Sequence, residues 1–166
     1  MHVEESLAAL EHVRRFTGPI VDVGSGGGAP GIPLAAALPE REVTLLEASR
    51  RKCEFLERWA EEFPNAHVVR GRAEEQATDE FGVAVAKALA PPAVALEWCL
   101  PLVASGGAAI LYTGPSVNAA AVAHVAERLA GGRPESYPGL LVVPKLGPTP
   151  PGFPRRPGAA RKRPLA

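Results

Sequence analysis

Hydrophobic and polar positions along the chain predict strands and helices in regular alternation. Short apolar runs bounded by turn residues are typical of buried parallel strands, and we expect such strands at 20–23, 43–46, 67–70, 83–86, 108–112 and 140–143. Apolar residues spaced three and four apart predict the intervening helices, which we expect at 4–16, 32–38, 49–63, 92–102 and 116–129. The pattern predicts an α/β fold with a mostly parallel central sheet and helices on both faces.

A glycine-rich stretch follows the first predicted strand. Residues 22–26 read Asp-Val-Gly-Ser-Gly, and further glycines follow before the next predicted helix. A strand, a glycine loop and a helix in this order place a nucleotide-like ligand beyond the carboxyl end of a sheet. No Gly-Lys-Ser/Thr ends the loop, which argues against a phosphate-binding loop of the nucleotide triphosphatase kind, and the spacing does not fit G-x-G-x-x-G. The pattern Asp22-x-Gly24-x-Gly26 is instead similar to the first motif of S-adenosylmethionine-dependent methyltransferases, although a purely structural turn is the alternative.

Acidic residues complete a predicted nucleoside pocket. Glu47 ends the second predicted strand, about twenty residues after the glycine loop, where a carboxylate accepts hydrogen bonds from both ribose hydroxyls. Asp22 is a candidate to hold the methionine amino group, directly or through water. Ala73 and Glu74 follow the third strand and are expected to border the adenine ring. Because NAD also offers a ribose to Glu47, a nicotinamide-dependent oxidoreductase is a rival hypothesis, weakened by the absence of a Tyr-x-x-x-Lys set.

Charge is distributed unevenly along the 166 residues. The net charge is zero, yet residues 136–166 carry six basic side chains and no acidic one, which leaves 12 basic and 18 acidic side chains in residues 1–135. A segregated basic end favours a polyanionic partner, RNA first, although a disordered solubilising tail is the alternative. The candidate RNA-binding residues are Lys145, Arg155, Arg156, Arg161, Lys162 and Arg163.

The same region suggests where the folded body ends. Prolines recur between residues 148 and 164, and proline disfavours both helix and sheet. We therefore predict a methyltransferase-like domain over 1–145 and an extended, surface-lying, proline-rich basic tail over 146–166.

Other residue classes narrow the function further. Cys53 and Cys99 lie in apolar helical patterns and are expected to pack rather than to act as nucleophiles. His67 has no partner at metal-ligand spacing, so no metal site is predicted. Tyr112 is the best placed aromatic residue to stack on a base, whereas Trp59 and Trp98 are interpreted as packing residues. No apolar run of 18 residues and no signal-peptide core are present, so we expect a cytoplasmic protein that does not enter the membrane.

Five stretches together carry a resemblance to a known family. They are residues 21–34 (VDVGSGGGAPGIPL), residues 71–75 (GRAEE) and residues 86–91 (AKALAP), with FPRRPG at 153–158 and KRPL at 162–165 in the tail. These stretches resemble the RsmG family, also called GidB (glucose-inhibited division protein B). The resemblance implies a Rossmann-like class I fold, S-adenosyl-L-methionine as cofactor and methyl transfer to N7 of a guanine in bacterial 16S rRNA. The implied partner is 16S rRNA or the small ribosomal subunit, with the enzyme a monomer.

The resemblance also assigns roles to single positions. Gly24 and Ala29 fall at cofactor contacts of the glycine loop, and Ala73 with Glu74 falls beside the adenine. Lys87 occupies a position that faces the cofactor or substrate, where the family has arginine; lysine keeps the charge but not the planar fork. Because guanine N7 carries a lone pair and no proton, we expect no general base and no catalytic residue beyond positioning, Lys87 being the one candidate.

The resemblance implies an additional N-terminal helical segment with a Trp and an Asn-Leu-Thr motif, which this sequence lacks; we expect either that the sequence is shortened or that part of the RNA-facing surface has been lost. A catalytically impaired protein that keeps the cofactor fold and binds RNA is therefore the second hypothesis.

Overall fold

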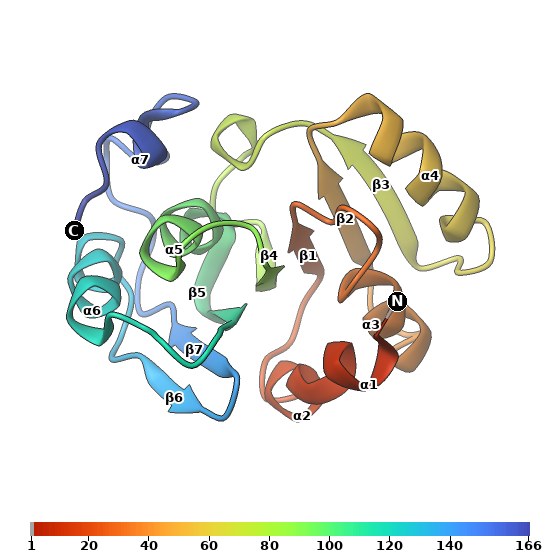
Figure 1. Cartoon of the computed structure of the whole chain (residues 1–166), viewed down its shortest axis with the longest axis horizontal. Coiled ribbons are helices and arrows are strands. Elements are labelled where there is room, and N and C mark those ends of the chain that lie inside the picture. Colours follow the sequence, from red (N-terminus) through yellow and green to blue (C-terminus); the bar gives the residue numbers. More distant parts are fainter. Residues whose placement is uncertain (1) are drawn as a thin grey trace.

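Seven strands form one mixed sheet in the computed structural model, which describes residues 2–166 (Figure 1). The strand order is β3-β2-β1-β4-β5-β7-β6, with β1 to β5 parallel and β7 antiparallel to both of its neighbours. Strand order reverses beside β1, which is where α/β sheets of this kind bind ligands. The strands are β1 (Ile20–Val23), β2 (Val43–Glu47), β3 (Ala66–Arg70), β4 (Phe81–Lys87), β5 (Val103–Tyr112), β6 (Glu135–Tyr137) and β7 (Leu140–Pro144).

Helices cover both faces of this sheet because successive strand residues point to opposite sides. One core joins Val21, Val23 and other side chains of one face to α5, α6 and α7, and a second core joins the other face to α1–α4. The helices are α1 (Val3–Ser6), α2 (Leu10–Val13), α3 (Gly31–Ala37), α4 (Arg50–Ala60), α5 (Pro92–Cys99), α6 (Ala119–Arg128) and α7 (Ala159–Lys162), with 3₁₀ turns η1 (Leu7–Ala9), η2 (Ala73–Glu75) and η3 (Leu100–Leu102). The predicted α/β class with a mostly parallel sheet is confirmed. From residue 2 to residue 166, no helix has the length and apolar character needed to cross a bilayer.

Two predicted helices differ from the structure. The helix expected at 4–16 is broken into α1 and α2 around η1. At the break, the hydroxyl of Tyr112 donates a hydrogen bond to the carbonyl of Ser6, which occupies a carbonyl that a continuous helix would use. The helix expected from residue 116 begins at Ala119, because the side chain of Asn118 accepts from the backbone N–H of Ala121 at 3.0 Å and caps it there.

Two features of the sheet were not predicted from the sequence. β6 was not predicted, because an exposed edge strand of Glu135, Ser136 and Tyr137 has no apolar pattern. β5 begins five residues early and runs through the predicted Ser-Gly-Gly turn, with Gly106 at a φ of +91°. A glycine in the left-handed region is typical of such an irregularity within a strand.

The C-terminal segment (residues 146–166) was predicted to be extended, but it is not extended throughout. It contains α7, and within α7 the side chain of Ala160 is buried. Phe153, Ala160 and Leu165 pack on the core that also includes α5, and Figure 1 shows α7 lying beside α5. The prolines exclude long regular elements, but one turn of helix fits between Pro157 and Pro164. The segment therefore packs onto the same body as the sheet.

Candidate functional site

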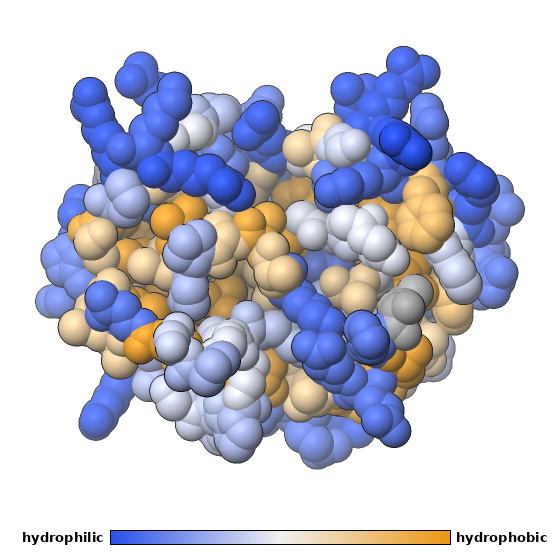
Figure 2. Space-filling view, in the orientation of Figure 1, coloured by the Kyte–Doolittle hydropathy of each residue, from blue (hydrophilic) through white to orange (hydrophobic). Residues whose placement is uncertain are grey.

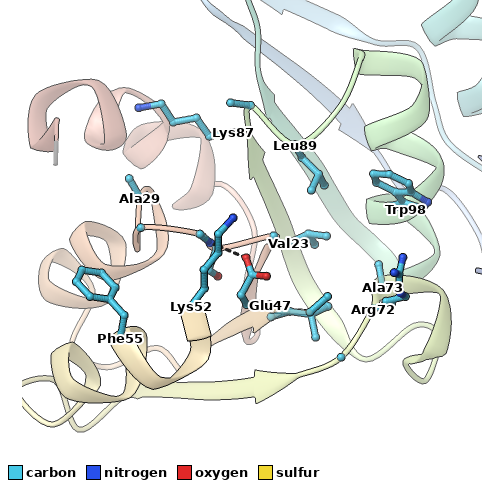
Figure 3. Close-up of a pocket in the computed structure, with 18 of the residues that line it drawn as sticks. Val23, Ala29, Glu47, Lys52, Phe55, Arg72, Ala73, Lys87, Leu89 and Trp98 are labelled. Carbon is cyan, nitrogen blue, oxygen red and sulfur yellow. Dashed lines mark hydrogen bonds between the residues drawn. The ribbon is translucent and has the colours of Figure 1, made fainter. Parts of the chain in front are cut away.

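A cavity of about 840 Å³ opens beyond the carboxyl ends of β1, β2 and β4 (Figure 3). This volume lies within the range of small-molecule and cofactor sites. The structure brings most of the predicted cofactor residues to its wall, which includes Gly24, Gly26, Ala29, Glu47, Ala73, Glu74 and Lys87.

The glycine loop is shaped by close approach of the backbone to its neighbours. Gly24 has a φ of +71°, and a Cβ at this residue would lie 2.4 Å from Cδ1 of Leu89. A Cβ on Gly31 would lie 2.3 Å from Leu45 and 2.6 Å from Oδ2 of Asp22. Side chains therefore do not fit at these two positions, and the loop lines the cavity with its backbone at Gly24, Gly26 and Gly27.

Asp22 lies beneath the loop and not on the cavity wall. Its side chain is fully buried, and Oδ2 accepts a hydrogen bond from the backbone N–H of Gly31 at 2.9 Å. Within residues 2–166, Oδ1 has no hydrogen-bond partner. Burial raises the pKa of Asp22 to about 7, although the hydrogen bond from Gly31 acts in the opposite direction. A direct contact with a methionine amino group, as predicted, does not fit this position; the carboxylate instead holds the loop against the following helix.

Glu47 presents its carboxylate at the floor of the cavity, where β2 ends (Figure 3). Oε1 accepts from the backbone N–H of Gly26 at 3.0 Å, and Oε2 accepts from the backbone N–H of Ser49 at 2.8 Å. Because each carboxylate oxygen accepts more than one hydrogen bond, both keep acceptor capacity for a ligand. The two backbone donors hold the carboxylate in one orientation, as recognition of a vicinal pair of hydroxyls requires.

Aromatic and aliphatic side chains bound the far end of the cavity, where η2 lies. Ala73 is buried there, and Leu89 and Trp98 line the same end of the cavity (Figure 3). Oε2 of Glu74 accepts from the backbone N–H of Gly158 at 3.1 Å. This apolar end of the cavity, which we call the slot, has one carboxylate at its edge and suits a purine ring.

Lys87 lies at the opposite end of the cavity, at the end of β4 (Figure 3). Its ammonium group is 3.1 Å from a carboxylate oxygen of Glu5 in α1. Sequence reasoning missed Glu5, because nothing in its local pattern distinguishes it from a solvated helix residue. The ion pair fixes where the positive charge of Lys87 lies.

Phe55 and Trp59 are further wall residues that the sequence analysis missed. Both lie on α4 and are about 40% exposed, at 41% and 38%, although Trp59 was interpreted as a packing residue. That interpretation was wrong, and the spacing Lys52-x-x-Phe55-x-x-x-Trp59, which puts all three residues on one helix face, was the available signal. Tyr112 was the predicted stacking residue. Its hydroxyl instead donates a hydrogen bond to the carbonyl of Ser6, and the residue does not line the cavity.

Both cysteines are buried, as predicted from their apolar surroundings. Burial raises the pKa of Cys53 and of Cys99, so both thiols stay protonated near neutral pH. The Cys53 thiol donates to the carbonyl of Glu47 at 3.2 Å, which links α4 to the end of β2.

Residues 1–140 match the protein family described as GidB, rRNA small subunit methyltransferase G. The chain belongs to this family. Its relatives include the ribosomal RNA small subunit methyltransferase G of Synechococcus elongatus, with 35% identity over 99% of this chain and 76% of that protein. The enzyme of the same name from Pelotomaculum thermopropionicum has 36% identity over 99% of this chain and 77% of that protein. The predicted family resemblance is confirmed.

Solved structures share the fold of this methyltransferase G chain. A predicted O-methyltransferase from Agrobacterium tumefaciens superposes with a TM-score of 0.64 at 22% identity, over 85% of this chain and 77% of that one. An S-adenosylmethionine-dependent O-methyltransferase from Thermotoga maritima superposes with a TM-score of 0.66 at 15% identity, over 86% and 65%. The fold is therefore that of the class I S-adenosylmethionine-dependent methyltransferases.

The residues of the cavity fit S-adenosyl-L-methionine. The backbone of the glycine loop lines one side, Glu47 offers two oriented acceptor oxygens at the floor, and Ala73, Leu89 and Trp98 line one end. Basic side chains at the wall match the carboxylate of the cofactor and the phosphates of a nucleic acid; they are Lys52, Arg72, Lys87 and Arg161.

Lys145 does not lie on the surface of this methyltransferase, and its predicted role in RNA binding is wrong for this structure. The side chain is 1% exposed. Its ammonium donates to Oδ1 of Asp79 at 3.1 Å, to the hydroxyl of Thr149, and to the carbonyls of Leu100 and Val103 at 2.9 and 2.6 Å. Burial lowers the pKa of Lys145, and Asp79 offsets part of that effect. Sequence position alone does not reveal this, because three of the four partners, Asp79, Leu100 and Val103, lie more than 40 residues away.

Arg155 also has a structural partner. Its guanidinium forms a bidentate ion pair with Glu97 of α5, with Nε–Oε1 at 2.5 Å and Nη2–Oε2 at 2.7 Å. Arg156, Lys162 and Arg163 are exposed, and together with Arg155 they line a second hollow of about 700 Å³. Three predicted RNA-binding residues are thus free to meet an anion there, whereas Arg161 lies at the cofactor cavity.

Proposed function

We propose that this methyltransferase transfers a methyl group from S-adenosyl-L-methionine to N7 of a guanine in the 16S rRNA of the small ribosomal subunit. Family membership supports the reaction class, and the relatives are named for small-subunit rRNA. The observation that carries the cofactor is Glu47, oriented by the N–H groups of Gly26 and Ser49 at the point where strand order reverses.

The proposed cofactor contacts divide among three parts of the wall. Gly24, Gly26 and Ala29 let the backbone approach the methionine part of the ligand, and Glu47 accepts from the ribose hydroxyls. Ala73 and Glu74 border the adenine. Bound there, S-adenosyl-L-methionine supplies an electrophilic methyl group.

Positioning is the chain's main contribution to the proposed reaction. Guanine N7 has an exposed lone pair and no proton at neutral pH, so the protein has no proton to remove before transfer. Aligning two bound reactants contributes up to about 7–11 kcal/mol in the best intramolecular cases. Lys87, held by Glu5 at the end of the cavity away from the adenine slot, is proposed to orient the incoming nucleotide through its charge.

The proposed RNA surface has a basic ridge over α7 and a ridge of mixed charge over α4, where Glu54 and Glu57 are also exposed. Figure 2 shows hydrophilic side chains over α7 and over α4, on either side of a paler hollow. Arg156, Lys162 and Arg163 belong to the first ridge, and Arg51 and Arg58 belong to the second; all five are exposed. Phosphates bound at both ridges would place an unstacked base between them, above the cavity. One copy of the chain suffices for this arrangement, and the proposed substrate would place the enzyme in the cytoplasm.

Methyl transfer to isolated subunits tests this proposal. Labelled S-adenosyl-L-methionine is incubated with small ribosomal subunits, and with naked 16S rRNA, from cells that lack the modification. We expect label in 16S rRNA and chain cleavage at one N7-methylguanine after reduction and aniline treatment. The variant Glu47→Gln serves as the negative control, because it keeps the size of the side chain but not its charge.

Two results would replace the proposal. Cofactor binding without transfer to either substrate would indicate an RNA-binding protein that has kept only the fold. Tight binding of NADH with no binding of S-adenosylhomocysteine would indicate the oxidoreductase hypothesis.

A further inference from the structure

The C-terminal segment reaches the cofactor cavity, although its sequence pointed only to RNA. Gly158 and Arg161 belong to the wall of the cavity, at the end where Ala73, Glu74 and Trp98 lie. The predicted cofactor residues all precede residue 88. The cavity is thus completed by a segment about 70 residues further along the chain.

A buried ion pair holds this segment in place. Glu97 is only 3% exposed, and both of its oxygens accept from Arg155. Arg155 also donates through Nη2 to the carbonyl of Arg163 at 2.9 Å, which joins the two ends of the stretch 155–163. The hydrogen bonds to Glu97 raise the pKa of Arg155. Because Glu97 is desolvated, losing Arg155 leaves a buried charge without a partner, so the docked position of the stretch is strongly specified.

On the cavity side the same stretch touches three elements of the wall. The N–H of Gly158 donates to Glu74, Nη2 of Arg161 donates to the carbonyl of Leu89 at 3.2 Å, and the guanidinium of Arg161 lies 5.2 Å from the centre of the Trp98 ring. Among residues 2–166, Leu89 is the one hydrogen-bond acceptor of Arg161. Arginine has five N–H donors in a plane, so most of them remain free beside the slot.

We propose that Arg161 contacts the adenine of the bound cofactor and that Arg155 is the positioning residue that places it there. A planar guanidinium stacks on aromatic rings and donates to ring nitrogens, and here it lies over the indole of Trp98 at the slot assigned to the purine. This inference rests on the proposed function, because the ligand it assigns is the nucleoside part of S-adenosyl-L-methionine. It moves Arg155 and Arg161 from RNA binding to the cofactor site.

Calorimetric titration of the full chain with S-adenosylhomocysteine tests the inference. We expect Arg161→Gln to weaken binding by roughly fivefold to tenfold. Arg161→Lys should weaken binding less, because lysine keeps the charge, but it should not restore wild-type affinity, because lysine cannot form the planar stack. The matched control is Arg133→Gln, an exposed arginine with no side-chain hydrogen bond within the described residues, which should bind like the wild type. The same loss should appear with 5′-methylthioadenosine, which carries the adenine but not the amino acid.

Arg155 needs a design that separates positioning from folding. Arg155→Gln leaves Glu97 buried and charged, so we expect weaker cofactor binding together with a lower melting temperature. The double variant Arg155→Gln/Glu97→Gln removes the unpaired charge; it should recover most of the melting temperature and only part of the affinity, because two neutral amides hold the stretch less firmly.

The outcomes are distinct. Wild-type affinity in Arg161→Gln, with the wild type binding normally, overturns the inference and leaves the proposed function intact. Wild-type affinity in the double variant overturns the positioning role of Arg155. Failure of the wild type to bind S-adenosylhomocysteine overturns the proposed function and this inference with it.

Discussion

The glycine loop and the C-terminal segment both supply wall residues to the same cavity, but they are encoded in opposite ways. In the loop, the chemistry is local: residues 22–31 form a strand end, a tight turn and a helix start, and each glycine is explained by a neighbour in space. In the C-terminal segment and at Lys145 just before it, six basic residues look alike in sequence. Their partners divide them into a buried lysine, an anchoring arginine, a cavity arginine and three exposed residues.

The contrast shows that basic residues in one run need not share a function. The buried side chain of Lys145 pairs with Asp79, and Arg155 pairs with the buried carboxylate of Glu97; these partners lie 66 and 58 residues away in sequence. Buried charges are rare unless they are paired. A segment can therefore present net positive charge while part of that charge stabilises the fold and never meets RNA.

The largest expected effect separates Lys145 from the exposed basic residues. Lys145→Met should lower the free energy of unfolding by about 3–5 kcal/mol, because Asp79 and two carbonyls lose their donor. Urea unfolding measures the change, with Arg133→Met as the surface control. Adding Asp79→Asn should recover part of the loss. A Lys145→Met protein within about 0.5 kcal/mol of the wild type would contradict the structural role.

Burial of Asp22 beneath the glycine loop should lower the free energy of unfolding, whereas the ion pairs of Lys145 and Arg155 should raise it. The pKa of Asp22 is about 7 in the folded protein, against an ordinary value of 3.8, so between these values the folded state holds a proton that the unfolded state has lost. The free energy of unfolding should then fall as pH rises from about 4 to 7, by roughly 4 kcal/mol, and stay level above. Asp22→Asn keeps an acceptor for Gly31 and should remove this pH dependence in urea titrations at pH 4.5, 6 and 8. An unchanged slope would mean that another group is responsible.

The next prediction concerns the affinity of the Glu47 site for the cofactor. Glu47→Gln replaces one charged acceptor by an amide, and one oxygen is lost to the ribose. We expect the Kd for S-adenosylhomocysteine to rise by roughly 30-fold, about 2 kcal/mol. Glu54→Gln on the exposed face of α4 is the control and should leave calorimetric affinity unchanged. Equal affinity in both variants would remove Glu47 from the site.

The smallest effects are expected for the exposed members of the C-terminal segment. Arg156→Gln and Lys162→Gln should each weaken binding to 16S rRNA a few-fold and reduce the slope of log K against log salt by about 0.7–0.9. Their affinity for S-adenosylhomocysteine should stay at the wild-type value, unlike that of Arg161→Gln. Filter binding at several salt concentrations measures the slopes. A loss of cofactor affinity in Arg156→Gln would contradict the assignment of Arg156 to RNA binding and of Arg161 to cofactor binding.

Local sequence patterns predicted most of the fold and the part of the cavity wall that the glycine loop and Glu47 form. The β-branched run before Gly24, the helical spacing of Cys53 and Leu56, and the carboxylate that ends β2 all act through neighbours within one turn or one strand. The misses have a common cause. β6 is an edge strand without an apolar pattern, the break between α1 and α2 coincides with a hydrogen bond from Tyr112 about 100 residues away, and the exposure of Trp59 depends on what α4 packs against.

The amino-acid order alone thus determines the alternating strands and helices, the glycine turn and its family, because backbone sterics and the burial of apolar faces act over short stretches of chain. It does not determine what each charged side chain does. That is settled when β4, α5 and the C-terminal segment pack together, since a charge is driven to pair only once folding has removed the water around it. Lys145, Arg155 and Arg161 acquire separate roles at that step and at no earlier one.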